Sequence, residues 1–207
     1  MSNQPALKIN TSDGRFARSQ KTKDAIVKAL LKLLNDTPFP TAEQVARESK
    51  IGLRTVYRQF KDIESIYLSL HEECLYSLNK MFANEIDVSK SFQERVNFAV
   101  SERLAIYSEY ETLFISTISN AARLPILVDQ VAASYQIMRK RFIKIVPEIK
   151  NLSTIKSDLL FTRILFPTWF SLTNVLKHDQ KTIIDELSID LMEYIKSNIK
   201  KWGCNYS

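Results

Sequence analysis

The sequence predicts an all-α protein, and three observations support this expectation. Apolar residues recur at steps of three and four through most of the chain, which is the spacing that places side chains on one face of a helix. No segment shows the strict alternation of apolar and polar residues that is typical of a strand. Prolines and polar turns divide the chain into segments of helical length. We therefore expect a basic N-terminal module of three helices, joined by a long helix to a larger helical lobe.

Composition allows one or two globular units and excludes several kinds of active site. The chain has 207 residues, of which 45% are hydrophobic and 25% are charged, as in ordinary globular proteins. The only glycines are Gly14, Gly52 and Gly203, which excludes a Gly-rich phosphate loop, a dinucleotide fingerprint and a glycine-flanked nucleophile elbow. Two distant cysteines and two histidines have no metal-ligand spacing. We expect no metal, no cofactor and no enzymatic activity.

The chain shows no sign of export or of membrane insertion. Its first residues are polar and basic without the central apolar block of a secretory signal. No segment approaches the run of about 18 apolar residues that a membrane-spanning helix needs. We therefore expect a cytoplasmic protein that does not interact with membranes.

Positive charge is concentrated in the first third of the chain. Residues 1–61 contain twelve basic and five acidic residues, a net charge of +7, whereas the remaining 146 residues carry a net charge of −1. This segregation indicates that one part of the molecule faces a polyanion and that the other part has a different role.

The N-terminal part divides into an arm and three helices. Residues 1–17 have no periodicity, and we expect a flexible basic arm there. A first helix begins near Arg18 and ends at the proline-containing turn 35–40. Thr41, with Gln44 three residues later, has the pattern of a capping box and begins a second helix that ends near Ser49. After a break at 50–53, a third short helix covers 54–60, so that 18–62 is expected to form a helix-turn-helix domain.

The remainder, 63–207, is expected to form a second helical domain. Asp62 is a suitable N-cap for a long helix over 63–82, in which apolar residues recur at i, i+3, i+4 and i+7. Further helices are expected at about 89–108, 110–120, 124–146, 153–177 and 180–201, with Pro125, Pro147 and Pro167 at ends or kinks.

The third helix has the side chains that nucleic-acid recognition needs. Its apolar positions are Val56 and Phe60, and the residues left on its outer faces and at its exit are Arg54, Thr55, Tyr57, Arg58, Gln59 and Lys61. Arginine pairs with guanine edges and glutamine with adenine, while threonine, tyrosine and lysine contact phosphates. The alternative is a solvated helix face without function, which the helix-turn-helix pattern and the charge segregation make less favoured.

The segment 45–60 resembles the helix-turn-helix of the tetracycline-repressor (TetR) family of transcriptional regulators. The resemblance is densest at Val45-Ala46, Ile51, Thr55-Val56-Tyr57 and Phe60. It implies that Thr41, Thr55, Tyr57 and Lys61 contact phosphates and that Leu53, Arg54, Arg58 and Gln59 face base edges.

Three positions depart from the family pattern. Lys50 stands where the family usually has a glycine, and this position would need a left-handed backbone unless the turn shifts toward Gly52. Gly52 stands where a capping serine is frequent, and Ile63 where a lysine is frequent.

The resemblance also implies a homodimer that packs through its last two long helices and a small-molecule effector bound in the C-terminal lobe. The run 159–176 has large apolar residues all around the helix, which predicts burial on nearly all sides. The aromatic residues able to line an effector cavity are Tyr107, Phe114, Tyr135, Phe142, Trp169 and Phe170. Polar residues that would orient a ligand or reach solvent are Arg103, Asn120, Arg163, Thr173 and His178.

The leading hypothesis is a repressor that binds a double-stranded DNA operator and is released by its effector. Two alternatives remain open: an all-helical enzyme whose basic end holds an anionic substrate, and a small-molecule-binding or adaptor protein without sequence-specific DNA binding.

Overall fold

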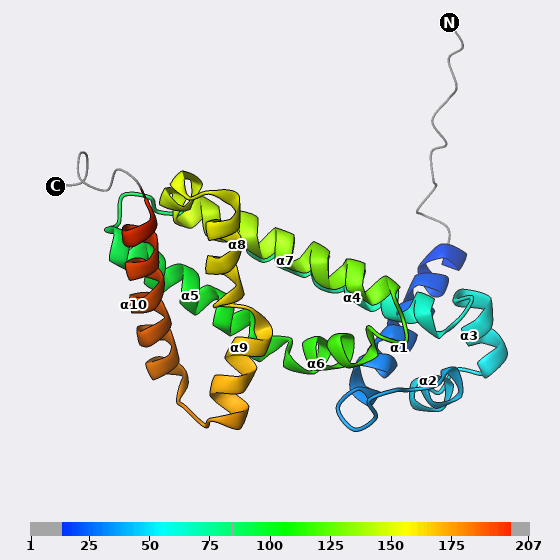
Figure 1. The fold of residues 1–207 in the computed structure, drawn as a ribbon. Helices are drawn as coiled ribbons and strands as arrows, with labels where there is room; N and C mark the ends of the chain where they lie inside the picture. Colours follow the sequence, from blue (N-terminus) through cyan, green and yellow to red (C-terminus); the bar gives the residue numbers. More distant parts are fainter. Residues whose placement is uncertain (1–13, 84, 200–207) are drawn as a thin grey trace, which may run out of the picture.

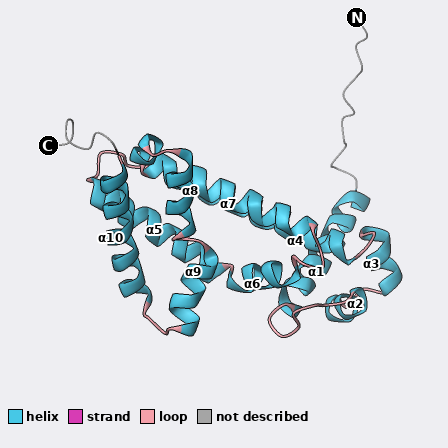
Figure 2. Cartoon of the chain, viewed as in Figure 1, coloured by secondary structure: helices cyan, strands magenta, loops and turns pink. Residues whose placement is uncertain are grey.

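A computed structural model describes residues 14–83 and 85–199 (Figure 1). All regular structure in these two ranges is helical, which confirms the predicted fold class (Figure 2). Within them no helix has the length and apolar character needed to cross a bilayer. The helices are α1 (Gly14–Leu33), α2 (Ala42–Ser49), α3 (Leu53–Gln59), α4 (Ile63–Met81), α5 (Phe92–Glu109), α6 (Glu111–Asn120), α7 (Ile126–Ile145), the 3₁₀-helix η1 (Pro147–Asn151), α8 (Thr154–Thr162), α9 (Phe166–Phe170), the π-helical turn η2 (Ser171–Val175) and α10 (Gln180–Asn198).

The first helix begins earlier than the sequence predicted. Its start near Arg18 was wrong by four residues, because α1 begins at Gly14. The Nε of Arg18 donates a hydrogen bond to the carbonyl of Gly14 at 3.0 Å, and Thr22 donates its hydroxyl to the carbonyl of Arg18 at 2.9 Å. These first turns are mostly exposed, so they lack the apolar periodicity that marks a helix in a sequence. Residues 1–13 of the expected arm lie outside the described residues.

The second helix starts as predicted. The backbone N–H of Gln44 donates to the Thr41 hydroxyl at 3.3 Å, and the backbone N–H of Thr41 donates to Gln44 Oε1 at 2.7 Å. This capping box satisfies two donors that have no partner inside the helix.

The turn between α2 and α3 is centred on Lys50. Its φ of 56° lies in the left-handed region, whereas Gly52 has a φ of −58°. The N–H of Ile51 donates to the carbonyl of Ala46 at 3.1 Å, which closes a Schellman-type end of α2. The turn therefore does not shift to the glycine, and the steric cost of a left-handed lysine is present.

The long fourth helix connects the two ends of the molecule. Asp62 caps it as predicted, since its carboxylate accepts the backbone N–H of Ser65 at 2.8 Å. This hydrogen bond, with a second one from the Ser65 hydroxyl, lowers the pKa of Asp62. Ile66, Tyr67 and Leu70 of α4 are buried in the N-terminal module, while Leu78 is buried in the C-terminal lobe.

Two hydrophobic clusters form the interior. The N-terminal cluster includes Ile26, Leu30, Val45, Val56, Phe60, Ile66, Leu70, Leu113 and Leu127. The C-terminal cluster includes Leu78, Val96, Leu104, Tyr107, Phe114, Met138, Phe142, Leu160, Phe166, Trp169, Leu191 and Ile195. Because α6 and α7 contribute Leu113 and Leu127 to the N-terminal cluster, the module packs directly against the larger lobe.

Helices α5, α6 and α7 begin and end within three residues of the predicted ranges. The prediction of one continuous helix over 153–177 is wrong. The helix is broken at 163–165, where α8 has ended and α9 has not begun. Pro167 stands in the first turn of α9, where its missing N–H costs nothing, whereas the interior of a continuous helix would lose a hydrogen bond and clash. The last helix ends at Asn198, and residues 200 and 201 of the expected range lie outside the described residues.

Buried ion pairs join the helices of the C-terminal lobe. Arg95 of α5 forms two hydrogen bonds with the carboxylate of Glu148 in η1, at 2.5 and 2.9 Å, and both side chains are buried. Arg141 of α7 pairs with Glu102 of α5 at 2.8 Å. A buried charge is tolerated when it is paired and hydrogen-bonded, as both arginines are.

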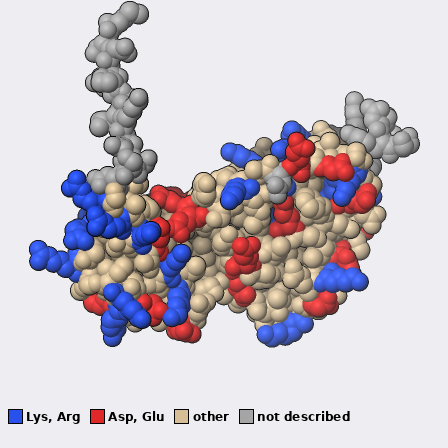
Figure 3. All heavy atoms as spheres, turned by 180° about the vertical axis from the view of Figure 1, so that it is seen from behind, with Lys and Arg blue, Asp and Glu red and all other residues tan. Residues whose placement is uncertain are grey.

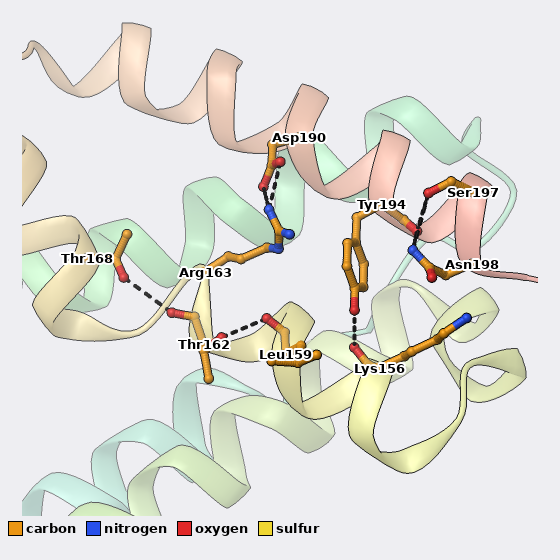
Figure 4. A network of polar contacts seen from close by, with 9 residues as sticks. All are labelled: Lys156, Leu159, Thr162, Arg163, Thr168, Asp190, Tyr194, Ser197 and Asn198. Atoms are coloured by element: carbon orange, nitrogen blue, oxygen red, sulfur yellow. Dashed lines mark hydrogen bonds and ion pairs between the residues drawn. The ribbon is translucent and has the colours of Figure 1, made fainter.

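A more exposed network attaches α10 to α8 (Figure 4). Arg163 donates to both carboxylate oxygens of Asp190 at 2.8 Å, and its guanidinium lies 4.6 Å from the ring centre of Tyr194. The hydroxyl of Tyr194 donates to the carbonyl of Lys156 at 3.2 Å.

Candidate nucleic-acid interface

Helix α3 exposes its polar face at one end of the molecule. Val56 and Phe60 are buried as predicted, and they fix the opposite face outward. Arg54 and Arg58 are exposed, and Tyr57 between them is 48% exposed, so its ring is not part of the core. These three side chains are therefore free to contact DNA if α3 lies in its major groove.

Two of the predicted contact residues also have structural roles. The hydroxyl of Thr41 belongs to the capping box of α2. The Oε1 of Gln59 accepts a hydrogen bond from the Ser19 hydroxyl at 3.0 Å, which ties α3 to α1. Gln59 therefore reaches a base edge only if this bond is released or if its amide nitrogen makes the contact. Leu53 and Thr55 are half-buried at the start of α3, and Lys61 is exposed just after it.

Basic side chains gather over the N-terminal module (Figure 3). One of them is neutralised within the module, since Lys32 pairs with Glu48 at 2.5 Å across α1 and α2. Arg54, Arg58 and Lys61 have no ion pair among residues 14–83 and 85–199, and they carry the exposed positive charge of the α3 surface.

The predicted effector residues mostly share one aromatic cluster. Five of the six contact one another or a further ring, that of Phe166: Tyr107, Phe114, Tyr135, Trp169 and Phe170. Phe166 stacks on Phe114 with ring centres 4.9 Å apart. Phe166 was not among the predicted residues, although it lies in the same apolar run directly before Pro167. Phe142 packs instead against Phe161 at 5.7 Å.

A small cavity lies between α4, α6 and α7. Its volume is about 20 Å³, and Phe114 is the one predicted effector residue among its lining side chains. His71 and Cys74 of α4 also line it, and burial raises the pKa of the Cys74 thiol to about 11. A cavity of this size holds about one water molecule.

His71 links α4 to α6 at this cavity, a role that its sequence context did not indicate. Its Nδ1 lies 2.8 Å from the carbonyl of Tyr67, and its Nε2 lies 2.7 Å from the hydroxyl of Thr117. Burial lowers the pKa of His71, because the low-polarity interior disfavours the imidazolium. The described residues contain no group of three or more His, Cys, Asp or Glu side chains arranged to hold a metal ion.

No family model matches the chain, and no curated protein matches it significantly. Solved structures do resemble it. A candidate fatty acid metabolism regulator from Clostridium perfringens is 16% identical with a TM-score of 0.60, and the match covers 82% of this chain and 97% of that one. A candidate TetR-family transcriptional regulator from Mesorhizobium loti is 15% identical with a TM-score of 0.62, covering 87% and 98%. The chain therefore has the all-helical fold that is found in TetR-family transcriptional regulators.

Proposed function

We propose that the protein is a TetR-family transcriptional regulator that binds a DNA operator as a homodimer and is released by a small molecule. The observation that carries this proposal is the outward face of α3, where Arg54, Tyr57 and Arg58 are exposed above the buried Val56 and Phe60. An α-helix fits the major groove, and exposed arginines form bidentate hydrogen bonds with guanine. The structural likeness to regulators supports the same function.

Exposed apolar side chains support dimerisation through the C-terminal helices. The run 159–176 was expected to be buried nearly all around, yet one chain leaves large apolar residues in and around α8, η2 and α10 between 47% and 65% exposed: Ile155, Leu159, Val175, Leu176 and Ile189. A second copy packed on these residues would bury them. Two copies of α3 about 34–36 Å apart would then face successive major grooves.

Helix α4 supports a coupling between effector and DNA. It follows α3 directly at Asp62, and eight residues after its start His71 lies at the cavity beside Phe114. A ligand that favours one placement of α4 would change the spacing of the two α3 helices, and by linkage DNA would lower the affinity for that ligand.

Fluorescence anisotropy on the DNA that flanks the protein's own gene tests this proposal. We expect tight binding that exceeds binding to shuffled DNA and weakens steeply with salt, because phosphate contacts release counterions. Arg54→Ala or Arg58→Ala should cost about 1–3 kcal/mol of binding free energy and relax specificity. Lys61→Ala should weaken binding to all sequences and lower the salt slope by about 1.

The matched control is Lys144→Ala, which removes an exposed positive charge from the last turn of α7 without touching the module. Weak binding that is equal on both DNAs, or arginine variants that bind like Lys144→Ala, would refute the assignment of α3 and favour an adaptor.

Sedimentation equilibrium tests the dimer separately. Leu159→Glu places a charge on the proposed interface and should convert the dimer to a monomer, because an unpaired buried carboxylate is strongly disfavoured. Val88→Glu, at an exposed apolar residue between α4 and α5, should leave the dimer intact. A Leu159→Glu protein that stays dimeric would place the interface elsewhere.

A further inference from the structure

The most unusual charge in the C-terminal lobe is that of Arg103 on α5. Its side chain is only 3% exposed. Its Nη1 lies 3.5 Å from the hydroxyl oxygen of Tyr107, a long hydrogen bond, and its Nη2 has no hydrogen-bond partner among the described residues. A buried guanidinium without a carboxylate loses its hydration without compensation.

Neighbouring arginines show what is missing at Arg103. Arg95 and Arg141 are similarly buried, and each is paired with a glutamate. Among the described residues, Arg103 has no carboxylate partner: beside its long hydrogen bond to Tyr107 it faces the rings of Phe142 and Phe161, whose centres lie 5.8 and 6.0 Å from its guanidinium carbon. These distances are at the outer limit of a cation–π interaction, so the rings compensate little of the buried charge.

A second buried donor lies beside the same tyrosine. The indole Nε1 of Trp169 also lacks a partner within the described ranges, and its ring centre lies 5.8 Å from that of Tyr107. The Tyr107 hydroxyl donates to the carbonyl of Ile164 at 2.8 Å, which leaves its oxygen to accept from Arg103. The Arg103 and Trp169 atoms without partners are both N–H donors, and one of them is cationic. Such a set is complementary to an anion that only accepts hydrogen bonds.

The wall around these donors is aromatic and backed by irregular backbone. Phe166 and Trp169 come from the short helix α9, which starts after the break at 163–165 and runs into the π-helical turn η2. Phe114 lies between the 20 Å³ cavity, which it lines, and Tyr107, whose ring centre is 5.2 Å away. A ligand body among these rings requires them to separate, because Phe114 stacks on Phe166 with ring centres 4.9 Å apart. π-helical turns are frequent at functional sites.

We propose that the effector is a small carboxylate with an apolar body, that its carboxylate pairs with Arg103, and that its body lies among Phe114, Phe166 and Trp169. This inference deepens the proposed function, since it names the chemical class of the ligand that would release DNA. Arg103 is then a ligand-binding residue and not a structural cation. The apolar rings supply affinity for the body, while the buried guanidinium selects the acid over its neutral analogues.

Matched acids and amides test the selection for charge. The probes are octanoate and 3-phenylpropionate, each compared with its primary amide, and binding to the full-length protein is measured by isothermal titration calorimetry without DNA. We expect both acids to bind about tenfold or more tightly than their amides, because a hydrogen bond to a charged group is worth more than one to a neutral group.

Variants of Arg103 and Arg139 test whether the preference for the acid over the amide depends on Arg103. Arg103→Met should lose the preference for the acid and should melt no lower than the unliganded wild type, because it removes an uncompensated buried charge. Arg139→Met is the control, since Arg139 also lies over the Phe161 ring, at 4.7 Å, but is paired with Asp158. This variant should retain the preference. Arg103→Lys, which keeps the charge, replaces Arg103→Met if the latter fails to fold, and should retain part of the preference.

Three outcomes would overturn the inference: acids and amides that bind equally, acids that fail to bind at millimolar concentration, or an acid preference that survives in Arg103→Met. Because these titrations contain no DNA, their failure is distinct from a failure to bind the operator. In the complementary arm, octanoate added to the operator complex should lower the anisotropy of wild type and Arg139→Met but not of Arg103→Met.

Discussion

The two ends of the molecule use arginine in opposite ways. In the C-terminal lobe, Arg95, Arg141 and Arg163 each donate to a carboxylate from another part of the fold. On α3, Arg54 and Arg58 extend into solvent, and the described residues offer them no hydrogen bond or ion pair. A paired arginine stabilises one arrangement of helices, whereas an unpaired one contacts a phosphate or a base without first breaking a bond. The partner of a basic residue, more than its presence, therefore distinguishes a structural surface from a binding surface.

Breaking the Arg95–Glu148 pair, the most buried of these ion pairs, should change the free energy of unfolding most. Glu148→Ala leaves Arg95 buried without its carboxylate and should lower the free energy of unfolding by about 3–5 kcal/mol. Urea unfolding measures the change. Arg54→Ala should stay within about 0.5 kcal/mol of wild type, because it removes an exposed side chain. Equal losses in the two variants would contradict the division between structural and binding arginines.

The buried contact between His71 of α4 and Thr117 of α6 should make the free energy of unfolding depend on pH. Because burial lowers the pKa of His71, the unfolded chain takes up a proton at pH values where the folded protein does not. The contribution of His71 is complete above its unfolded pKa of about 6.5 and is lost as the pH falls toward its lowered value, at no more than about 1.4 kcal/mol per pH unit. Cys74, with its pKa raised to about 11, stays neutral throughout this range.

Unfolding of His71→Gln and His178→Gln between pH 7.5 and 5.5 measures this dependence. His71→Gln should flatten the fall in stability, while His178→Gln, at an exposed histidine before α10, should follow wild type. An unchanged slope in His71→Gln would mean that the histidine is not buried in its neutral form.

Relief of the strained turn should give a smaller and opposite change within the N-terminal module. Lys50→Gly removes the side chain from a residue with φ of 56°, and it should raise the free energy of unfolding by about 1 kcal/mol. Thermal unfolding without DNA keeps any contact between Lys50 and phosphate out of the measurement. Gly52→Ala is the comparison, because Gly52 has an ordinary φ and an added Cβ meets no atom within 4 Å. A destabilised Lys50→Gly would show that the left-handed turn carries no strain.

The smallest effect is expected at the exposed pair of the C-terminal lobe. Arg163→Met removes the Asp190 pair, whose two side chains are 39% and 47% exposed. It should cost no more than about 1 kcal/mol, since water already solvates both charges. A loss as large as that of Glu148→Ala would mean that a partner chain buries this network.

The helices that sequence predicted well are those whose signals are local. Thr41 and Asp62 are recognisable caps because their partners lie three residues away, and Val56 and Phe60 indicate the buried face of α3 by their spacing. The break at 163–165 was missed because Arg163, Ile164 and Leu165 are all compatible with a helix, and only Pro167 marked a discontinuity there. The early start of α1 was missed because an exposed turn has no apolar stripe to detect.

Sequence was less informative about the interior of the second lobe. Arg95 and Glu148 are 53 residues apart, and no periodicity specifies that they meet. The aromatic set was predicted as a group, but Phe166, which contacts four of its members, was not. The place of His71 at the cavity was not predicted either. Both depend on the tertiary packing of α4, α6 and α9, which no local pattern indicates. The exposed face of α3 needed no such packing, since one short helix displays it.

The continuity of α4 has a mechanical consequence. At about 1.5 Å per residue, its 19 residues form a rod about 28 Å long that is buried in one cluster at each end. A rigid rod of that length turns a tilt of about 10° at one end into a displacement of about 5 Å at the other, which exceeds the rise of about 3.4 Å per base pair of DNA. A tilt of this size that keeps Leu78 in place would thus move the start of α4, and α3 with it, by more than the rise of one base pair.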